Sequence, residues 1–276
     1  MSDVVTILDN RVSHWKLEEA SGNRVDEETN GNDLNDLNTV TSATGIQGDG
    51  AFFVDANDER LIISSGDQTG MGITGDVSIS CWVYLNTLPA SGAEMWIASK
   101  YQGVAPRTGY GFGISNRSGS IGLVARAATI SNGFSQCDSS TNGITTGTWY
   151  HIVIGIDVST SEANFYVNGT SWGVVSLSAS LGGSIATGSN SFVVGGQPND
   201  VRESFDGIID ELTLTSDLIT SGEVTSLYNS GSGVPYSGGS GPTSDIKSIY
   251  GTVQASIKSQ YGILNANIKS KYGISN

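Results

Sequence analysis

The sequence predicts an all-β chain: an antiparallel β-sandwich with one short helix and a C-terminal repeat tail. Three observations favour this fold class. Short apolar runs alternate with Gly, Ser, Asn and Asp clusters, a pattern typical of strands joined by tight polar turns. Glycine contributes 37 of the 276 residues, while only 14% of residues are charged, against roughly 25% in an average domain. Hydrophobic residues make up 37%, which is enough for a core.

Several of the predicted strands alternate between apolar and polar residues with period two. Within residues 77–84, for example, Val77 and Ile79 fall on one face, and Ser78 and Ser80 on the other. The pair Asn168-Gly169 between two such runs is typical of a tight hairpin turn. The predicted strands are residues 51–54, 61–64, 77–84, 95–100, 111–115, 121–126, 149–157, 163–167, 192–195 and 205–215.

One helix is predicted over residues 221–228. It places Val224, Leu227 and Tyr228 on one apolar stripe. We interpret Ser221 as its N-cap, although Glu223 then lies one position too early for a full capping box.

The chain divides into three parts: a sandwich at residues 1–236, a Gly/Ser/Pro linker at 237–244, and a three-repeat tail at 245–276. Residues 242–276 hold four lysines and one aspartate, whereas the rest holds 9 basic and 26 acidic residues. A single 11-residue repeat cannot bury its apolar face alone. We therefore expect β-arcs or hairpins that serve assembly through the recurring side chains Ile246, Tyr250, Ile257, Tyr261, Ile268 and Tyr272.

The composition excludes several classes of function. A net charge of −14, without a Lys/Arg cluster in the first 240 residues, argues against nucleic acid as a partner. No apolar run approaches the ~18 residues of a membrane span, and no signal peptide is recognised, so we expect no membrane partner. Cys81 and Cys137 are expected to be buried free thiols, with a disulfide left open.

Catalytic motifs are lacking as well. We find no run of spaced carboxylates of the glycosidase kind, no G-x-S-x-G, no H-E-x-x-H and no phosphate-binding loop. His14 and His151 lie inside strand-like patterns. The chain is therefore predicted not to be an enzyme.

Four segments in a fixed order carry a family resemblance. They are HWKLEEASG with VDEETNGN (14–22, 25–32), GIQGDGAFF (45–53), VSISCWV with WYHIV and FYVNG (77–83, 149–153, 165–169), and FDGIIDEL with EVTSLY (205–212, 223–228). Together they resemble a laminin-G-like domain of the concanavalin A-like lectin/glucanase superfamily. The resemblance covers about residues 1–230 and implies a jelly-roll sandwich.

The resemblance also implies a structural calcium ion. By position its ligands would be Asp210, Asp26 and a backbone carbonyl near Gly48. Calcium takes six to eight hard oxygen ligands, with carboxylates among them. The alternative is that the two aspartates cap loop amides.

Similar sandwich lectins bind sugars with aromatic platforms and polar loops. Trp15, Trp82 and Trp149 are expected in the core, whereas Trp96 and Trp172 are better candidates for stacking, although packing is favoured for them too. Two loops, 101–110 and 195–204, carry the candidate glycan-binding residues Tyr101, Arg107, Tyr110, Gln197, Asn199 and Asp200.

The tail repeats resemble the C-termini of some bacteriophage virion proteins. We therefore expect a virion or extracellular filament appendage that displays a glycan-binding jelly roll, with the tail joining its own subunits or other virion or filament proteins. One alternative is a secreted adhesin on a bacterial cell surface that binds carbohydrate. A second is a purely structural capsid-decoration or filament subunit.

Overall fold

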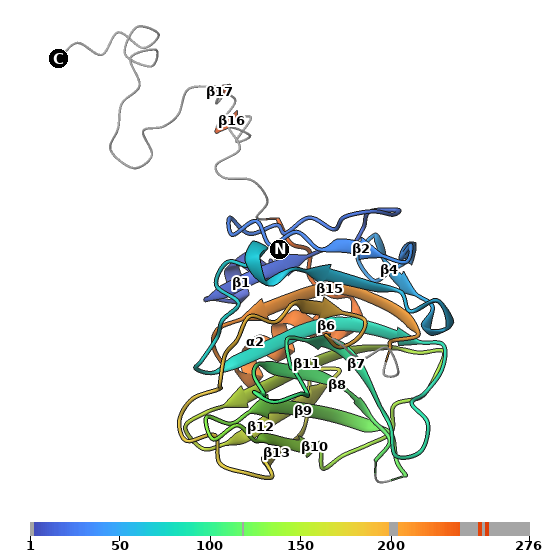
Figure 1. Cartoon of the computed structure of the whole chain (residues 1–276). Coiled ribbons are helices and arrows are strands. Elements are labelled where there is room, and N and C mark those ends of the chain that lie inside the picture. Colours follow the sequence, from blue (N-terminus) through green and yellow to red (C-terminus); the bar gives the residue numbers. More distant parts are fainter. Residues whose placement is uncertain (1–2, 118, 199–203, 238–247, 250–251, 254–276) are drawn as a thin grey trace, which may run out of the picture. The chain divides into compact units, whose positions relative to one another are not determined.

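Two antiparallel sheets pack face to face in the computed structural model (Figure 1). The structure describes residues 3–117, 119–198, 204–237, 248–249 and 252–253. Contacts divide the chain into two units, residues 1–239 and 240–276. The first unit contains both large sheets, as the predicted antiparallel β-sandwich requires.

One sheet has eight strands. Along it lie β13 (Thr170–Ser176), β12 (Glu162–Val167), β11 (Trp149–Asp157), β6 (Val77–Leu85), β15 (Gly207–Thr215), β4 (Asp49–Phe53) and β3 (Thr41–Thr44). The eighth, β1 (Arg11–Trp15), pairs with the second half of β15, while β4 pairs with its first three residues. The long strand β15, near the C-terminal end of the unit, thus pairs with β1 and β4 from its N-terminal part.

The other sheet has seven strands. Their order is β10 (Phe134–Asp138), β9 (Gly122–Ala128), β8 (Tyr110–Ser115), β7 (Glu94–Ser99), β14 (Phe192–Val194), β5 (Arg60–Ile63) and β2 (Asn35–Leu37). Alternate side chains of both sheets point inward and form one apolar core, in which Trp15, Phe112 and Phe165 are fully buried. Burial of such rings is the main force that holds the two layers together.

Each predicted strand is present, with ends shifted by at most two residues. Strands β1, β2, β3, β10 and β13 were not predicted, because polar residues interrupt their apolar runs. The hairpin turn between β12 and β13 is confirmed, since Asn168 and Gly169 both have positive φ angles, 50° and 75°. Cys81 and Cys137 are buried and free, as expected.

The predicted helix forms as α2 (Ser221–Tyr228), but its N-cap is Thr220 rather than Ser221. The Thr220 side chain accepts from the Glu223 N–H, and the Glu223 carboxylate accepts from the Thr220 N–H. Glu223 is therefore correctly spaced for a full capping box, counted from Thr220. The other described helices are short: α1 (Val4–Ile7), and the 3-10 turns η1 (Asp55–Asn57), η2 (Ser65–Asp67) and η3 (Asn229–Gly231). None of the described helices has the length and apolar character needed to span a bilayer.

A second apolar cluster covers the outer face of the eight-stranded sheet. Helices α1 and α2 and the segment around Tyr236 pack there against Val153 and Tyr166. Trp82 is buried beside α2, where its ring lies 5.8 Å from the Tyr228 ring and 5.1 Å from the His151 ring. This second cluster explains why β6 and β11 are buried on both faces.

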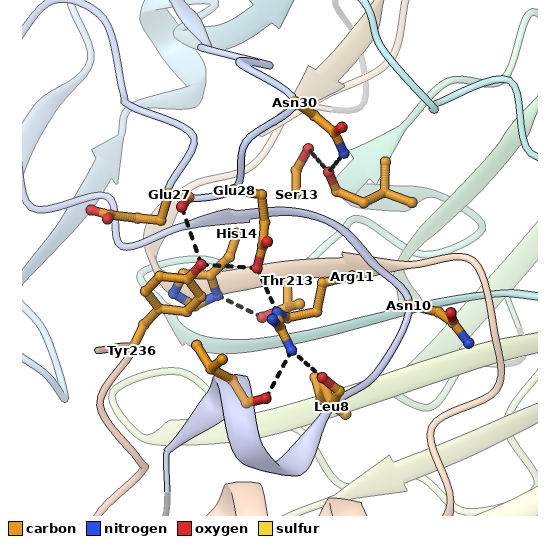
Figure 2. Close-up of polar contacts among 12 residues, drawn as sticks. Leu8, Asn10, Arg11, Ser13, His14, Glu27, Glu28, Asn30, Thr213 and Tyr236 are labelled. Carbon is orange, nitrogen blue, oxygen red and sulfur yellow. Dashed lines mark hydrogen bonds and ion pairs between the residues drawn. The ribbon is translucent and has the colours of Figure 1, made fainter. Parts of the chain in front are cut away.

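The two ends of the sandwich meet at a terminal clamp, which consists of Asp3–Leu8, Arg11, Glu28 and Pro235–Ser237. Figure 2 shows Arg11, Glu28 and Tyr236 of this clamp. Arg11 forms an ion pair with Glu28 at 2.5 Å and donates to the carbonyl groups of Val5 and Leu8. Tyr236 donates to the Glu27 carbonyl at 3.1 Å and to the Glu28 carboxylate at 2.9 Å. The ring of Tyr236 also stacks on His14, with ring centroids 4.2 Å apart.

Beneath Tyr236 lies a buried pair of polar groups, since His14 Nε2 is 3.1 Å from the Glu211 carboxyl. Burial lowers the pKa of His14 to about 3 and raises the pKa of Glu211 to about 8. Both groups are therefore neutral near pH 7. Neither Nε2 nor the facing Glu211 oxygen has an aligned hydrogen bond among the described residues, whereas the other ring nitrogen, Nδ1, is hydrogen-bonded to the Thr213 hydroxyl at 2.7 Å.

This pair predicts a loss of stability at alkaline pH. The unfolded chain releases the Glu211 proton near the ordinary pKa of 4.5, and the folded chain only near 8, so stability falls as pH rises through that window. We expect the melting temperature to drop by about 5 °C from about pH 6 to about pH 9. Thermal melts should show a smaller drop for Glu211→Gln, which cannot ionise. An unchanged drop in that variant would assign the effect to other groups.

In the second unit, β16 (Ser248–Ile249) and β17 (Thr252–Val253) pair as a small antiparallel hairpin. All six predicted assembly residues, Ile246, Tyr250, Ile257, Tyr261, Ile268 and Tyr272, lie outside the described residues.

Candidate functional site

A cavity of about 330 Å³ opens on the outer face of the seven-stranded sheet. Its volume is at the lower end of the range of small-molecule sites, roughly 300–1,000 Å³. Strands β7, β9 and β10 supply its base, and the loops after β7 and β8 supply its walls. The lining residues are Gly92, Glu94, Tyr101, Gly103, Arg107, Arg117, Arg126, Phe134 and Gln136.

Glycines shape the floor of this cavity. In β8 the inward residues are large, whereas the outward positions are Gly111 and Gly113. A Cβ atom on Gly111 would lie 2.9 Å from the Trp96 ring. The ring can therefore pack against β8 only because residue 111 has no side chain. Trp96 is fully buried, and the Arg126 guanidinium lies 4.6 Å from its ring centroid. Trp96 therefore supports the site from below and does not reach a ligand.

A polar network fixes the side chains on this floor. Arg126 pairs with Glu94 at 2.5 Å and donates to the Gln136 side chain at 2.6 Å. Gln136 also donates to Glu94, which closes a triangle of three side chains from three strands. Arg117 approaches Glu94 to 3.6 Å from the solvent side. Charge-assisted contacts of this kind are strong and hold the floor in one arrangement before a ligand binds.

The rim is aromatic on one side. Phe134 is 47% exposed and is the only exposed aromatic side chain among the residues whose burial is described. The Arg107 guanidinium lies 5.8 Å from the Phe134 ring, and the Arg107 N–H donates to the Asn132 side chain at 2.8 Å. Burial raises the pKa of the neighbouring Tyr101 hydroxyl, an effect that the nearby arginines and a hydrogen bond with Arg107 partly oppose.

The structure brings together two of the six predicted glycan-binding residues, Tyr101 and Arg107. Gln197 lines a second cavity of about 420 Å³, beside Arg60 and Val193 on the same sheet. Asn199 and Asp200 lie outside the described residues. The prediction for Tyr110 is wrong: its ring is fully buried between the sheets, and its hydroxyl donates to the Met71 carbonyl at 3.1 Å.

Sequence reasoning missed the residues that form the floor and the exposed ring: Glu94, Arg126, Phe134 and Gln136. Arg126 and Gln136 are direct cross-strand partners in β9 and β10. Finding them requires the strand order, which no local pattern gives. The signal that was available is the alternation in YGFGIS (110–115), where outward glycines indicate something packed closely above the strand.

The predicted calcium ligands are occupied by hydrogen-bond donors. Asp26 accepts from the N–H groups of His14, Glu28 and Asn32 and from the Ser13 hydroxyl. Asp210 accepts from Ile46 N–H at 2.7 Å and from Gln47 N–H at 3.1 Å, leaving one buried oxygen without a partner. The Gly48 carbonyl accepts from the Gly45 N–H. In the described residues, no three Asp, Glu, His or Cys side chains gather as a metal site.

For Asp26 these contacts fit amide capping better than metal ligation, because its two carboxylate oxygens already accept four hydrogen bonds. The calcium site is untested, and a chelator distinguishes it from the alternative of amide capping, which these contacts favour. We expect excess EDTA to leave the melting temperature unchanged, to within about 1 °C. A fall that added calcium reverses would show that an ion replaces some of these hydrogen bonds.

Comparisons with known proteins agree with this architecture. The family model Laminin_G_3, described as the concanavalin A-like lectin/glucanases superfamily, matches residues 55–225. No curated protein matches the chain. Domain 4 of the arabinanase AbnA from Geobacillus stearothermophilus, solved with arabinotriose, is 18% identical and has a TM-score of 0.59. The match covers 79% of this chain and 97% of that domain.

Toxin binding domains are similar in fold as well. The binding domain of Paraclostridial Mosquitocidal Protein 1 is 17% identical over 82% of this chain, with a TM-score of 0.62. The ligand-binding domain of botulinum neurotoxin serotype D, solved with N-acetylneuraminic acid, is 13% identical over 83%, with a TM-score of 0.56. The match spans 53% and 52% of those chains, respectively. With its two-sheet sandwich and the match over residues 55–225, the chain belongs to the Laminin_G_3 family of the concanavalin A-like lectin/glucanase superfamily.

Proposed function

We propose that this domain binds a glycan in the cavity beside Phe134, on the outer face of the seven-stranded sheet. The observation that carries the proposal is the exposed Phe134 ring at the rim of a cavity with a fixed polar floor. The apolar face of a sugar ring stacks on an aromatic side chain, while its hydroxyl groups pair with charged and amide groups. The solved complexes of similar fold with arabinotriose and N-acetylneuraminic acid support this class of ligand.

Binding without catalysis is the second part of the proposal. Glycosidases generally use two carboxylates, about 5–5.5 Å apart in retaining enzymes and 6.5–9.5 Å apart in inverting ones. The described lining residues of the cavity include one carboxylate, Glu94, which is 6% exposed and already paired with Arg126. A carboxylate held in this way is suited to orienting the arginine rather than to attacking a glycosidic bond.

The binding experiment compares Phe134→Ala with Val174→Ala. Val174 is also exposed, at 57%, but lies on β13 of the other sheet. On a glycan array followed by calorimetry, we expect Phe134→Ala to weaken binding about tenfold, as the loss of one stacking ring implies. Val174→Ala should bind as the unmodified protein does. Equal binding by both variants, or no glycan bound at all, would contradict the proposal.

The third part concerns assembly. The repeat tail supports a virion or filament appendage, in which weak sites gain avidity from many copies. A bacterial surface adhesin remains the alternative. Light scattering on the full chain and on a chain ending at Gly241 tests the role of the tail. A defined oligomer only for the full chain supports assembly through the tail, whereas two monomers exclude self-assembly by these repeats.

A further inference from the structure

The cavity has a local excess of positive charge in an acidic protein. Its lining contains three arginines, Arg107, Arg117 and Arg126, against one glutamate, Glu94. The whole chain has 13 basic and 27 acidic residues. Arginine is therefore concentrated at this one place, and the balance of charge in the lining is opposite to that of the chain.

Two of these arginines already have carboxylate partners. Arg126 forms a short ion pair with Glu94. Arg117 lies 3.6 Å from Glu94 and 3.9 Å from Asp138, and its side chain is 45% exposed. Arg107 differs, because among the described residues no carboxylate lies within 4.0 Å of its guanidinium. Its charge is the one that the described part of the site leaves uncompensated.

The Arg107 side chain is nevertheless held in place. Its backbone N–H donates to the Asn132 side chain at 2.8 Å, and its Nη1 donates to the Asn132 carbonyl at 3.4 Å. The Arg107 guanidinium carbon lies over the Phe134 ring, 5.8 Å from the ring centroid. A guanidinium has five N–H donors in a planar fork, so these contacts leave donors free for a ligand.

We propose that the ligand is an acidic sugar whose carboxylate binds Arg107 while its ring stacks on Phe134. The inference rests on the proposed glycan-binding function and adds the class of ligand. A planar carboxylate matches the guanidinium fork with two parallel hydrogen bonds. The acidic remainder of the protein does not prevent this, because charges farther than about 8–10 Å are largely screened at physiological salt.

The test uses pairs of sugars that differ in one negative charge: sialyllactose against lactose, and trigalacturonate against its methyl ester. By calorimetry we expect the acidic member of at least one pair to bind about 10- to 100-fold more tightly. Arg107→Gln should abolish this preference, and Arg107→Lys should keep part of it. Arg117→Gln is the matched control, because it removes an arginine of the same cavity that is already paired, and it should keep the preference. A thermal melt confirms that each variant is folded.

The outcomes separate this inference from the proposed function. If neutral and acidic members bind equally, and Phe134→Ala weakens both, glycan binding stands and the acidic ligand is wrong. If Arg117→Gln abolishes the preference as completely as Arg107→Gln does, general charge attraction replaces the specific contact. Tighter binding of sulfated lactose than of sialyllactose would overturn the choice of a carboxylate. No binding of any sugar would overturn both proposals.

Discussion

Glu94→Ala is expected to destabilise the domain by about 3–5 kcal/mol, because it leaves the largely buried Arg126 guanidinium without its carboxylate. The side chains of the pair are 5% and 15% exposed, so water can replace little of the lost interaction. Gln136 loses an acceptor in the same step. Chemical denaturation of the variant and the unmodified protein gives the difference directly, and glycan binding should be lost with the floor of the cavity.

Two further variants show whether the buried charge is the cause. Arg117→Gln removes the exposed partner of the same glutamate, and such surface pairs contribute roughly 0–1 kcal/mol. The double variant Glu94→Gln/Arg126→Met removes both buried charges and should recover part of the stability that Glu94→Ala loses. A loss for Arg117→Gln as large as that for Glu94→Ala would show that burial of Arg126 is not what makes Glu94 important.

Gly207→Ala is expected to lower the free energy of unfolding by more than about 4 kcal/mol. Losses of this size occur when the backbone cannot shift to make room for the new side chain. Gly207 begins β15 with a φ of 147°, and a Cβ atom there would lie 2.0 Å from the Tyr84 carbonyl oxygen. Both neighbours, β4 and β6, are paired at this residue, so neither strand can move away. Circular dichroism and thermal melting should report a protein that is largely unfolded near 40 °C or that fails to accumulate.

Gly222→Ala is the matched control for this change. Gly222 lies in the second position of α2, and nothing lies within 4 Å of the Cβ atom that alanine would add. There the substitution should stabilise the protein by up to about 1 kcal/mol, because alanine has the higher helix propensity. If Gly207→Ala melts like Gly222→Ala, the start of β15 is more adaptable than its geometry indicates.

The sandwich could be predicted from the sequence because its central strands show a clear pattern, as in β6, where Val77, Ile79 and Cys81 alternate with polar serines. The predicted strand at 111–115 begins one residue too late, after Tyr110. This tyrosine was interpreted as a loop residue, yet it shares the two-residue period of Phe112 and Ile114, which point into the core. Extending the strand by one residue would have placed it correctly.

The site was harder to predict because its residues come from strands that are distant in the sequence. Phe134 begins an edge strand whose other residues are mostly polar, so no apolar run indicates it. Glu94, Arg126 and Gln136 meet only because β7, β8, β9 and β10 lie in that order. Asp26 and Asp210 are predicted as calcium ligands from their positions in the family motif. Those positions do not reveal which backbone N–H groups donate to the two carboxylates.

The terminal clamp brings the two ends of the sandwich domain together. Val4 N–H donates to the Pro235 carbonyl, and Ser237 N–H to the Asp3 carboxylate, so the chain enters and leaves at one place. That place is on the outer face of the eight-stranded sheet, whereas the cavity opens on the outer face of the other sheet. A domain with adjoining ends can be inserted into a loop of another protein as readily as added to its end. In either position the cavity would lie on the face opposite the two ends.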